Sequence, residues 1–356
     1  MDDATALAPT DAVVQLREVG HERVLPLDRN RHVWHLGSGR GDGAPKAMDL
    51  IVPGLYVSRY HAKITRIGSW LQVENRSRNG TFIAGRREES FPILPGDTFT
   101  VAQVSLMALD GPMVELRRVL AWHLGYEAHL RVDRALLEIV NRAQAPLLVT
   151  GPRGSEPERL ATAIHPHTSR RDQPIEVIDV LTTRDAMAFQ LRRAGNGLVF
   201  VDLAPLRGRS APPPLTRALA EGCTARVMLA APSAAVARRA LDLPMVPLVE
   251  IEVPAVATRG ADVPAMLDAE LERRGSAHRV AELPRERRCA LSAFAWPANL
   301  EEIVATAERL DAYLDSGRSI RAAARRLGVD HRSFARALER VGATGRAEAT
   351  PDDETP

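Results

Sequence analysis

Lysine is almost missing from this chain of 356 residues, where it occurs only at Lys46 and Lys63. Any site later in the chain must therefore work without an ammonium side chain. Cysteine is equally scarce, and the two thiols, Cys223 and Cys289, have no neighbours at the spacing of a metal site or a disulfide framework. We therefore expect no metal centre, and a reducing compartment fits this composition.

The chain also lacks an apolar run long enough to span a bilayer, about 18 residues, so we expect no membrane-spanning helix and no membrane partner. Residues 1–11 are acidic and poor in apolar side chains, which argues against a signal peptide and predicts a disordered tail. We expect a cytoplasmic protein. The formal net charge is only +2, so any surface that binds nucleic acid must be local.

The composition is that of a globular protein, with 45% hydrophobic and 26% charged residues. The length predicts two or three domains. Residues 12–109 hold short apolar runs separated by turn signals such as Arg78-Asn79-Gly80 and Pro95-Gly96-Asp97. This pattern predicts an all-β sandwich.

Three short motifs in this β region occur in a fixed order. They are Ser58-Arg59-Tyr60-His61-Ala62, Ser77-Arg78-Asn79-Gly80-Thr81 and Leu94-Pro95-Gly96-Asp97. In this order they resemble the forkhead-associated (FHA) family, whose domains are eleven-stranded sandwiches that bind phosphothreonine peptides. We place this domain at residues 12–112.

The resemblance implies a role for each motif residue. Ser58 and Arg59 are expected to contact the phosphate, and Arg78 and Asn79 to hold the peptide backbone from the facing loop. His61 is expected to be buried and to brace the loop of Ser58. A phosphate carries about −1.5 to −2 charge and three acceptor oxygens, so guanidinium and hydroxyl donors on one rim suit it.

A further phosphate contact is expected from an arginine that follows a glycine after an early strand of the family. Two pairs compete for that position, Gly37-Ser38 and Gly39-Arg40. We choose Arg40 as the phosphate-binding residue. If Ser38 is the equivalent, the affinity for phosphate rests more on Arg59. The alternative for the whole domain is a sandwich whose loops bind no phosphopeptide.

From about Glu127 the pattern changes to apolar runs of strand length that alternate with helical segments. The expected strands are 145–150, 175–180, 197–202 and 226–230, and the expected helices are 132–144, 158–164, 184–194 and 214–221. Such alternation predicts a parallel sheet in an α/β domain, which we place at residues 120–260. After Asp262 the pattern is only helical.

Residues 145–165 resemble the phosphate-loop region of sigma-54-dependent activators of the AAA+ class. Gly151 and Gly154 match glycines of the loop, but Glu156 replaces a third glycine and Pro157 replaces the lysine. A phosphate loop works through backbone N–H donors and a lysine on the β- and γ-phosphates. Both replacements therefore oppose nucleotide binding, since Glu156 adds negative charge and Pro157 removes an N–H.

Two further nucleotide motifs of that family are altered. Asp202 matches a magnesium-binding aspartate, but we prefer a structural role for it, as a helix cap or loop anchor buried at a strand end. Leu203 stands where the family has its catalytic glutamate, and Glu301 where it has a nucleotide-sensing arginine. The G-A-F-T-G-A loop that contacts sigma-54 is not found. We therefore expect no enzyme activity and no bound cofactor, ATP included, and we place a helical lid at residues 261–313.

Residues 319–338 resemble the Fis-type helix-turn-helix that ends sigma-54 activators. We place this domain at 314–343, followed by an acidic tail at 344–356 that we expect to be disordered. Gly328 would permit the turn, and Asp330 would cap the second helix. The positions expected in the core are Ala322, Ala323, Leu327, Val329, Phe334 and Leu338.

The outer face of this segment is basic. The stretch from Arg318 to Arg340 contains seven arginines and two acidic residues, which is the local charge expected where DNA phosphates are contacted. By family position, the residues expected in the DNA groove are His331, Ser333 and Arg336. The residues expected to contact phosphates are Arg332 and Arg340.

The expected fold is therefore multidomain: an FHA sandwich, an AAA+-like parallel sheet with a helical lid, and a helix-turn-helix. The favoured function is a transcription regulator that binds a phosphothreonine-containing partner and double-stranded DNA. One alternative is a phosphothreonine-dependent scaffold in Ser/Thr kinase signalling that does not bind DNA, and another is an ATP-dependent sigma-54 activator. We expect a homodimer or higher homo-oligomer, whose contact includes the apolar stripe of Ile303, Ala307 and Leu310 unless that stripe belongs to the lid core.

Overall fold

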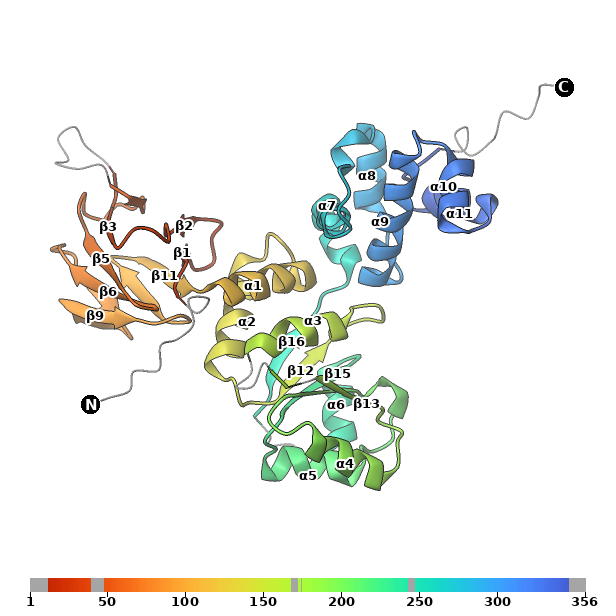
Figure 1. Ribbon diagram of the computed structural model, residues 1–356, viewed down its shortest axis with the longest axis horizontal. Helices are drawn as coiled ribbons and strands as arrows, with labels where there is room; N and C mark the ends of the chain where they lie inside the picture. The colour runs from red at the N-terminus through yellow and green to blue at the C-terminus, as the bar shows by residue number, and fades with distance from the viewer. Residues whose placement is uncertain (1–11, 40–47, 168–171, 174, 243–246, 346–356) are drawn as a thin grey trace. The chain divides into compact units, whose positions relative to one another are not determined.

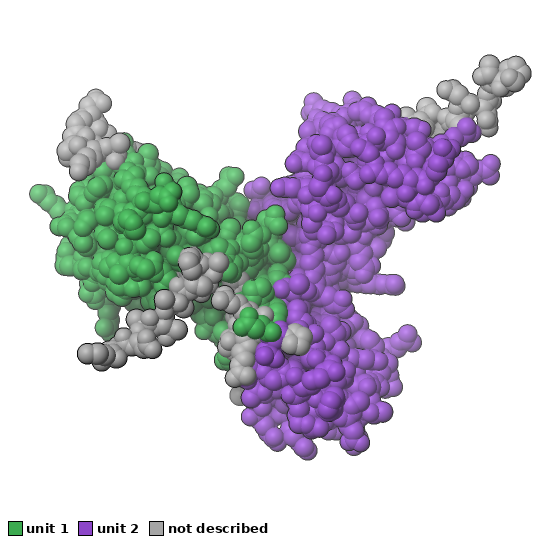
Figure 2. Space-filling model, viewed as in Figure 1, with its two compact units in different colours: residues 1–121, 128–144, 163–172 green, residues 122–127, 145–162, 173–356 purple. Residues whose placement is uncertain are grey.

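The computed structural model of the protein describes residues 12–39, 48–167, 172–173, 175–242 and 247–345. The chain divides into two compact units (Figure 2). The first consists of residues 1–121, 128–144 and 163–172. The second consists of residues 122–127, 145–162 and 173–356.

The first unit contains a sandwich of two mainly antiparallel sheets (Figure 1). One sheet has the order β2 (Val24–Pro26), β1 (Gln15–Glu18), β11 (Val104–Leu109), β10 (Thr98–Val101), β7 (Thr81–Ile83), β8 (Arg86–Glu88). The other has the order β4 (Leu50–Ile51), β3 (Val33–Gly37), β5 (Ala62–Ile67), β6 (Trp70–Asn75), β9 (Ser90–Ile93). Alternate residues of β6, such as Leu71 and Val73, are fully buried between the sheets, as the two-residue period of a strand requires. The predicted sandwich is confirmed.

Two helices accompany the sandwich, α1 (Gly111–Leu124), whose residues 122–124 already belong to the second unit, and α2 (His129–Asn141). Asp133 of α2 is fully buried and accepts hydrogen bonds from the Gly20 amide (2.8 Å) and from Nε of Arg117 (2.7 Å). It also forms an ion pair with Arg17 of β1 at 3.5 Å. The sandwich and α2 therefore share buried polar contacts, and the compact unit extends beyond the boundary at residue 112 that the sequence suggested.

The second unit contains a parallel sheet with the order β13 (Ile175–Ile178), β14 (Leu198–Asp202), β15 (Arg226–Ala231), β12 (Leu147–Thr150), β16 (Val249–Glu252). The helices that alternate with these strands are α3 (Pro157–Ile164), α4 (Arg184–Arg193), α5 (Pro213–Glu221) and α6 (Ala234–Leu241). Every residue of β12 and β15 is buried, which is typical of a sheet covered on both faces. The predicted α/β architecture is confirmed.

The rest of the second unit is helical. It consists of the short helix η4 (Val256–Asp262), α7 (Val263–Arg273), the short helix η5 (Val280–Glu282), α8 (Arg285–Ala293), α9 (Asn299–Asp315), α10 (Ile320–Leu327) and α11 (His331–Arg340). We call residues 256–345 the helical part. In the portion of the chain that the structure describes, no helix combines the length and apolar character needed to cross a membrane.

One hydrophobic core runs through the whole helical part. It includes Trp296, which precedes α9, and Leu300 at the start of α9, as well as Phe334 and Leu338 of α11. The predicted lid (261–313) and helix-turn-helix (314–343) therefore do not have separate cores. Ile303, Ala307 and Leu310 are fully buried in this shared core, so the stripe considered for a dimer contact lies inside the molecule.

Candidate functional site

The first candidate site lies on two loops of the sandwich, one between β4 and β5 and the other between β6 and β7. The hydroxyls of Ser58 and Ser77 lie 2.7 Å apart, which joins the loops side chain to side chain. The side-chain amide nitrogen (Nδ2) of Asn79 donates to the backbone carbonyl of Tyr56 at 2.6 Å. These two contacts bring the predicted residues of both motifs onto one rim.

The side chain of His61 supports this rim through hydrogen bonds to backbone groups of both loops. The Ser58 amide donates to Nδ1 of His61 (3.1 Å), so Nε2 carries the proton and donates to the Gly80 carbonyl (3.0 Å). The side chain is fully buried, and this burial lowers the pKa of the His61 imidazole, which favours the neutral ring. The predicted bracing role of His61 is confirmed by these contacts.

The positive charge of the rim comes from Arg59 and Arg78. Both side chains are exposed, and within the described residues neither guanidinium forms an ion pair or a hydrogen bond. The backbone of Arg59 packs directly against Gly37, where an added Cβ would lie only 1.9 Å from the Arg59 carbonyl oxygen. The rim therefore depends on a glycine at the end of β3.

Arg40 and Ser38 were the two alternatives for a further phosphate contact. Arg40 lies outside the described residues. Ser38 is 6% exposed, and its amide donates to the Ser58 carbonyl at 3.0 Å, which gives Ser38 a supporting role under the loop. Ser77 received no role from the sequence, although it is buried and also accepts a hydrogen bond from the Asn79 amide at 3.1 Å.

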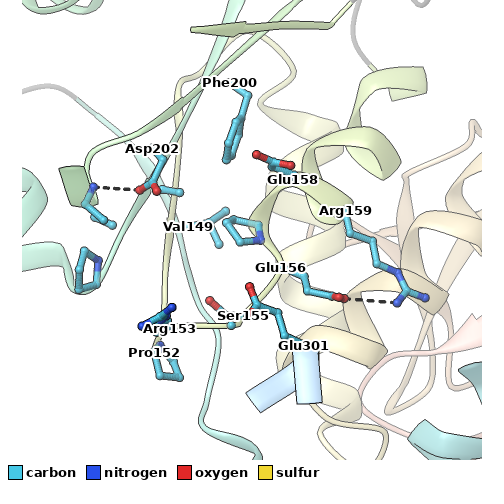
Figure 3. Close-up of a pocket in the computed structure, with 17 residues that line it drawn as sticks. Val149, Pro152, Arg153, Ser155, Glu156, Glu158, Arg159, Phe200, Asp202 and Glu301 are labelled. Carbon is cyan, nitrogen blue, oxygen red and sulfur yellow. Dashed lines mark hydrogen bonds and ion pairs between the residues drawn. The ribbon is translucent and has the colours of Figure 1, made fainter. Parts of the chain in front are cut away.

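The second candidate site is a cavity of about 710 Å³ in the second unit (Figure 3). The loop after β12 and the end of β14 line it, so the four residues expected at a degenerate nucleotide site lie together: Gly151, Gly154, Pro157 and Asp202. Acidic side chains dominate the charge of the lining, which contains Glu156, Glu158, Asp202 and Glu301 against Arg153 and Arg159.

The charge of this lining differs from that of a phosphate loop. Pro157 begins α3 where a phosphate loop needs its lysine, and Arg153 and Arg159 are the cations of the lining. The Glu156 carboxylate is bonded to Arg159 (3.4 Å; Figure 3), and burial raises the pKa of this glutamate. Leu203 is buried and does not line the cavity, so no carboxylate takes the place of the catalytic glutamate at this position.

Asp202 differs from the prediction in one respect. Its side chain is exposed, because it stands at the carboxyl end of β14 at the mouth of the cavity and not inside the sheet. Its carboxylate accepts a hydrogen bond from the Ala204 amide at 2.9 Å (Figure 3), at the start of the short helix η3 (Ala204–Leu206). This hydrogen bond anchors the loop after β14, whereas the N-cap position of η3 is Leu203, and the expected burial of Asp202 was wrong.

The third candidate site is formed by α10 and α11. Gly328 has a φ of 67° between them, and the Asp330 carboxylate caps α11 by accepting from the Ser333 amide at 2.8 Å. Both features were predicted. Val329, expected in the core, is 47% exposed, and Ala322 is also exposed. Ile320 and Ala324 are buried instead, because α10 turns that face toward α9.

The residues expected to contact DNA lie mostly on the surface. Arg332, Ser333 and Arg336 are exposed, and His331 is half-buried. Among the described residues, Arg332 and Arg336 have no ion-pair partner for their side chains. Arg340 differs, because its guanidinium is paired with Glu302, which is 6% exposed on α9. Its charge is therefore already compensated within the protein.

Comparison with known proteins identifies the first of these regions. Residues 34–102 match the model of the FHA domain, so the chain contains an FHA domain over this stretch. An ABC transporter ATP-binding/permease protein of Mycobacterium tuberculosis is 26% identical over 135 residues, which is 35% of this chain and 16% of that protein. The chain thus spans only a small part of this relative.

Solved structures also resemble the chain in part. The structure of NtrX of Brucella abortus in complex with ADP is 18% identical, with a TM-score of 0.42. The match covers 60% of this chain and 68% of the NtrX chain. EmbR of Mycobacterium tuberculosis, in complex with a low-affinity phosphopeptide, covers 28% of this chain and 24% of its own, with a TM-score of 0.24 and 22% identity.

Proposed function

We propose that this protein is a cytoplasmic transcription regulator that binds a phosphothreonine-containing partner through its FHA domain and double-stranded DNA through α10 and α11. The observation that supports it most is the rim of the FHA domain. Arg59 and Arg78, whose guanidiniums have no partner among the described residues, stand on the two loops that the hydrogen bond between the Ser58 and Ser77 hydroxyls joins. Charge-assisted hydrogen bonds from such groups are the strong contacts that phosphate recognition uses.

The first test removes one of these guanidiniums. In the full chain, Arg59→Ala is expected to weaken binding of phosphothreonine peptides by about 10- to 100-fold, because a hydrogen bond to a charged group is lost. Titration of a degenerate phosphothreonine library against the wild-type chain identifies the peptide for this comparison. Arg142→Ala, at the residue that follows α2 and outside the two loops that carry Ser58 and Arg78, is the matched control. Unchanged affinity in Arg59→Ala would show that the phosphate binds elsewhere.

DNA binding is supported by the charge and exposure of α11. Arg332 and Arg336 are exposed one turn apart near the capped start of this helix, which is the position from which a recognition helix contacts DNA. The two copies of the helix in a dimer would supply enough contacts for specific binding. Because the stripe on α9 is buried, the dimer contact must use another surface.

Three arginines of α11 are expected to respond differently in a DNA-binding test, because only Arg340 has an ion-pair partner among the described residues. Arg332→Ala is expected to weaken binding to all sequences and to lower the slope of log affinity against log salt by about one unit. Arg336→Ala is expected to relax sequence preference at a cost of about 1–3 kcal/mol. Arg340→Ala should change the salt slope less than Arg332→Ala, since Glu302 already compensates that charge.

Fluorescence anisotropy of the full chain on genomic fragments across a salt series measures all three variants. Arg217→Ala on α5 is the control for a lost surface charge. Absence of binding at low salt would remove the DNA part of the proposal. The phosphothreonine-dependent scaffold would then remain, an alternative that the internal pairing of Arg340 with Glu302 and of Arg326 with Asp315 favours.

We further propose that the second unit, although its sequence resembles AAA+ ATPases, hydrolyses no ATP. Pro157, Leu203 and Glu301 occupy the positions that need lysine, glutamate and arginine, and the acidic lining repels phosphates. Purified full-length protein is expected to release no phosphate from ATP, with or without DNA. Steady magnesium-dependent release that disappears in Asp202→Ala would contradict this and support an ATP-dependent activator.

A further inference from the structure

The loop that lines the acidic cavity is held through its carbonyl groups by residues outside the parallel sheet. The Arg153 carbonyl accepts from the side chain of Asn299 at 2.9 Å. The Gly154 carbonyl accepts from the Glu301 amide at 3.1 Å. The next contact comes from His123, fully buried, whose Nε2 lies 3.2 Å from the Glu156 carbonyl. Three carbonyls of one short loop are thus bonded to α1 and α9.

Asn299 connects three segments at once. Its amide nitrogen binds the loop at Arg153, and its oxygen accepts from the Val256 amide at 3.0 Å, where the chain passes from the sheet to the helical part. Asn299 is 6% exposed and has a φ of 51°, a left-handed conformation that asparagine tolerates better than most residues. A Cβ at Gly154 would lie 2.0 Å from the Ala298 carbonyl oxygen, so the two backbones meet here without space between them.

An ionic contact joins the same two regions at a second place. Arg159 of α3 forms ion pairs with Glu156 (3.4 Å) and with Glu270 of α7 (3.3 Å). Its guanidinium also lies 4.5 Å from the centroid of the Trp122 ring. Glu270 is fully buried and is further paired with Arg273 and Arg274 of its own helix. A buried carboxylate is stable only when it is paired, and Arg159 adds a partner for Glu270 from the sheet side to the two on its own helix.

We propose that these contacts fix the helical part onto the loop in one arrangement without any nucleotide. The loop, which has lost the means to hold phosphates, serves instead as a docking element for α7 and α9. Because α10 and α11 share the core of α9, their position is set by protein contacts and does not respond to ATP or ADP. The inference goes beyond the proposed function, since it holds whether or not α11 binds DNA.

Hydrogen exchange of the full chain tests this docking directly. ATP or ADP with magnesium at millimolar concentration is expected to leave exchange unchanged in the loop 151–157, in η4 and at the start of α9. Asn299→Ala is expected to raise exchange in all three segments by about 10- to 100-fold, because two buried hydrogen bonds are lost together. Exchange in the FHA domain should stay as it is.

Two further variants keep the test decisive. Arg159→Met retains an apolar stem beside Trp122 but removes the ion pairs with Glu156 and Glu270, so exchange should rise in α7 even if Asn299→Ala fails to fold. Asn30→Ala, an exposed position in the sandwich, is the matched control. The proposal is overturned if nucleotide protects the loop or α9 of the wild type. It is equally overturned if Arg159→Met leaves the exchange of α7 unchanged.

Discussion

Replacing Asp133 by alanine is expected to destabilise the first unit by about 3–5 kcal/mol, the cost of breaking a buried ion pair by removing one partner. The loss is large because Arg17 and Arg117 would both keep their charge while little of either side chain is open to water, 6% and 13%. The amide of Gly20 would also lose its acceptor. A cost of this size is a substantial fraction of the stability of a typical domain.

Urea unfolding of the full chain, followed by hydrogen exchange in peptides from β1 and α2, measures this effect locally. Glu138→Ala on the same helix is the control, since Glu138 forms only an exposed pair with Arg142, worth about 0.3–0.5 kcal/mol. Equal stability of the two variants would show that the sandwich does not depend on α2.

Replacing Gly37 by alanine is expected to weaken phosphothreonine binding by about 10-fold or more, since the rim would lose aligned charge-assisted hydrogen bonds. The added Cβ would lie 1.9 Å from the Arg59 carbonyl oxygen, a backbone atom that no side-chain rotation can move away. The loop that carries Ser58 and Arg59 must therefore shift, and the hydrogen bond from the Ser38 amide to the Ser58 carbonyl shifts with it.

Gly68→Ala is the control that distinguishes displacement of the Arg59 loop from the strain of adding a Cβ to a glycine elsewhere in the sandwich. Gly68 has a positive φ of 61°, which Gly37 does not have, and an added Cβ at Gly68 meets nothing within 4 Å. Calorimetric titration with the same phosphopeptide should give wild-type affinity for Gly68→Ala and reduced affinity for Gly37→Ala. A folded Gly37→Ala protein with wild-type affinity would mean that the position of Arg59 does not govern binding.

The FHA fold and most of its rim were predictable because their signals are local. Alternating apolar residues predict the strands of the sandwich. The bracing contact of His61 is also local, because Ser58 is only three positions away. The contact between Ser58 and Ser77 was not predictable in this way. It depends on the pairing of β5 with β6, which places residues far apart in sequence on facing loops.

The same distinction explains the differences in the second unit. The departures of Pro157, Leu203 and Glu301 from the motifs that the sequence resembles could be identified residue by residue, and the cap by Asp330 follows from a short local pattern. The ion pair between Arg159 and Glu270 joins residues 111 positions apart, and no local pattern marks it. Val329 was expected in the core, whereas packing of α10 against α9 buries Ile320 and Ala324 earlier in the chain.

The shared core of the helical part has a consequence for how an operator could be organised. A DNA-reading module on a flexible tether tolerates half-sites at many separations, because the tether absorbs the difference in distance and in helical phase. Here α11 packs in the same core as Trp296 and Leu310, so it is held directly by the helical part. For two copies joined through a fixed contact, half-site spacing becomes a property of the protein's own dimensions, so insertion of a few base pairs would rotate one half-site out of reach.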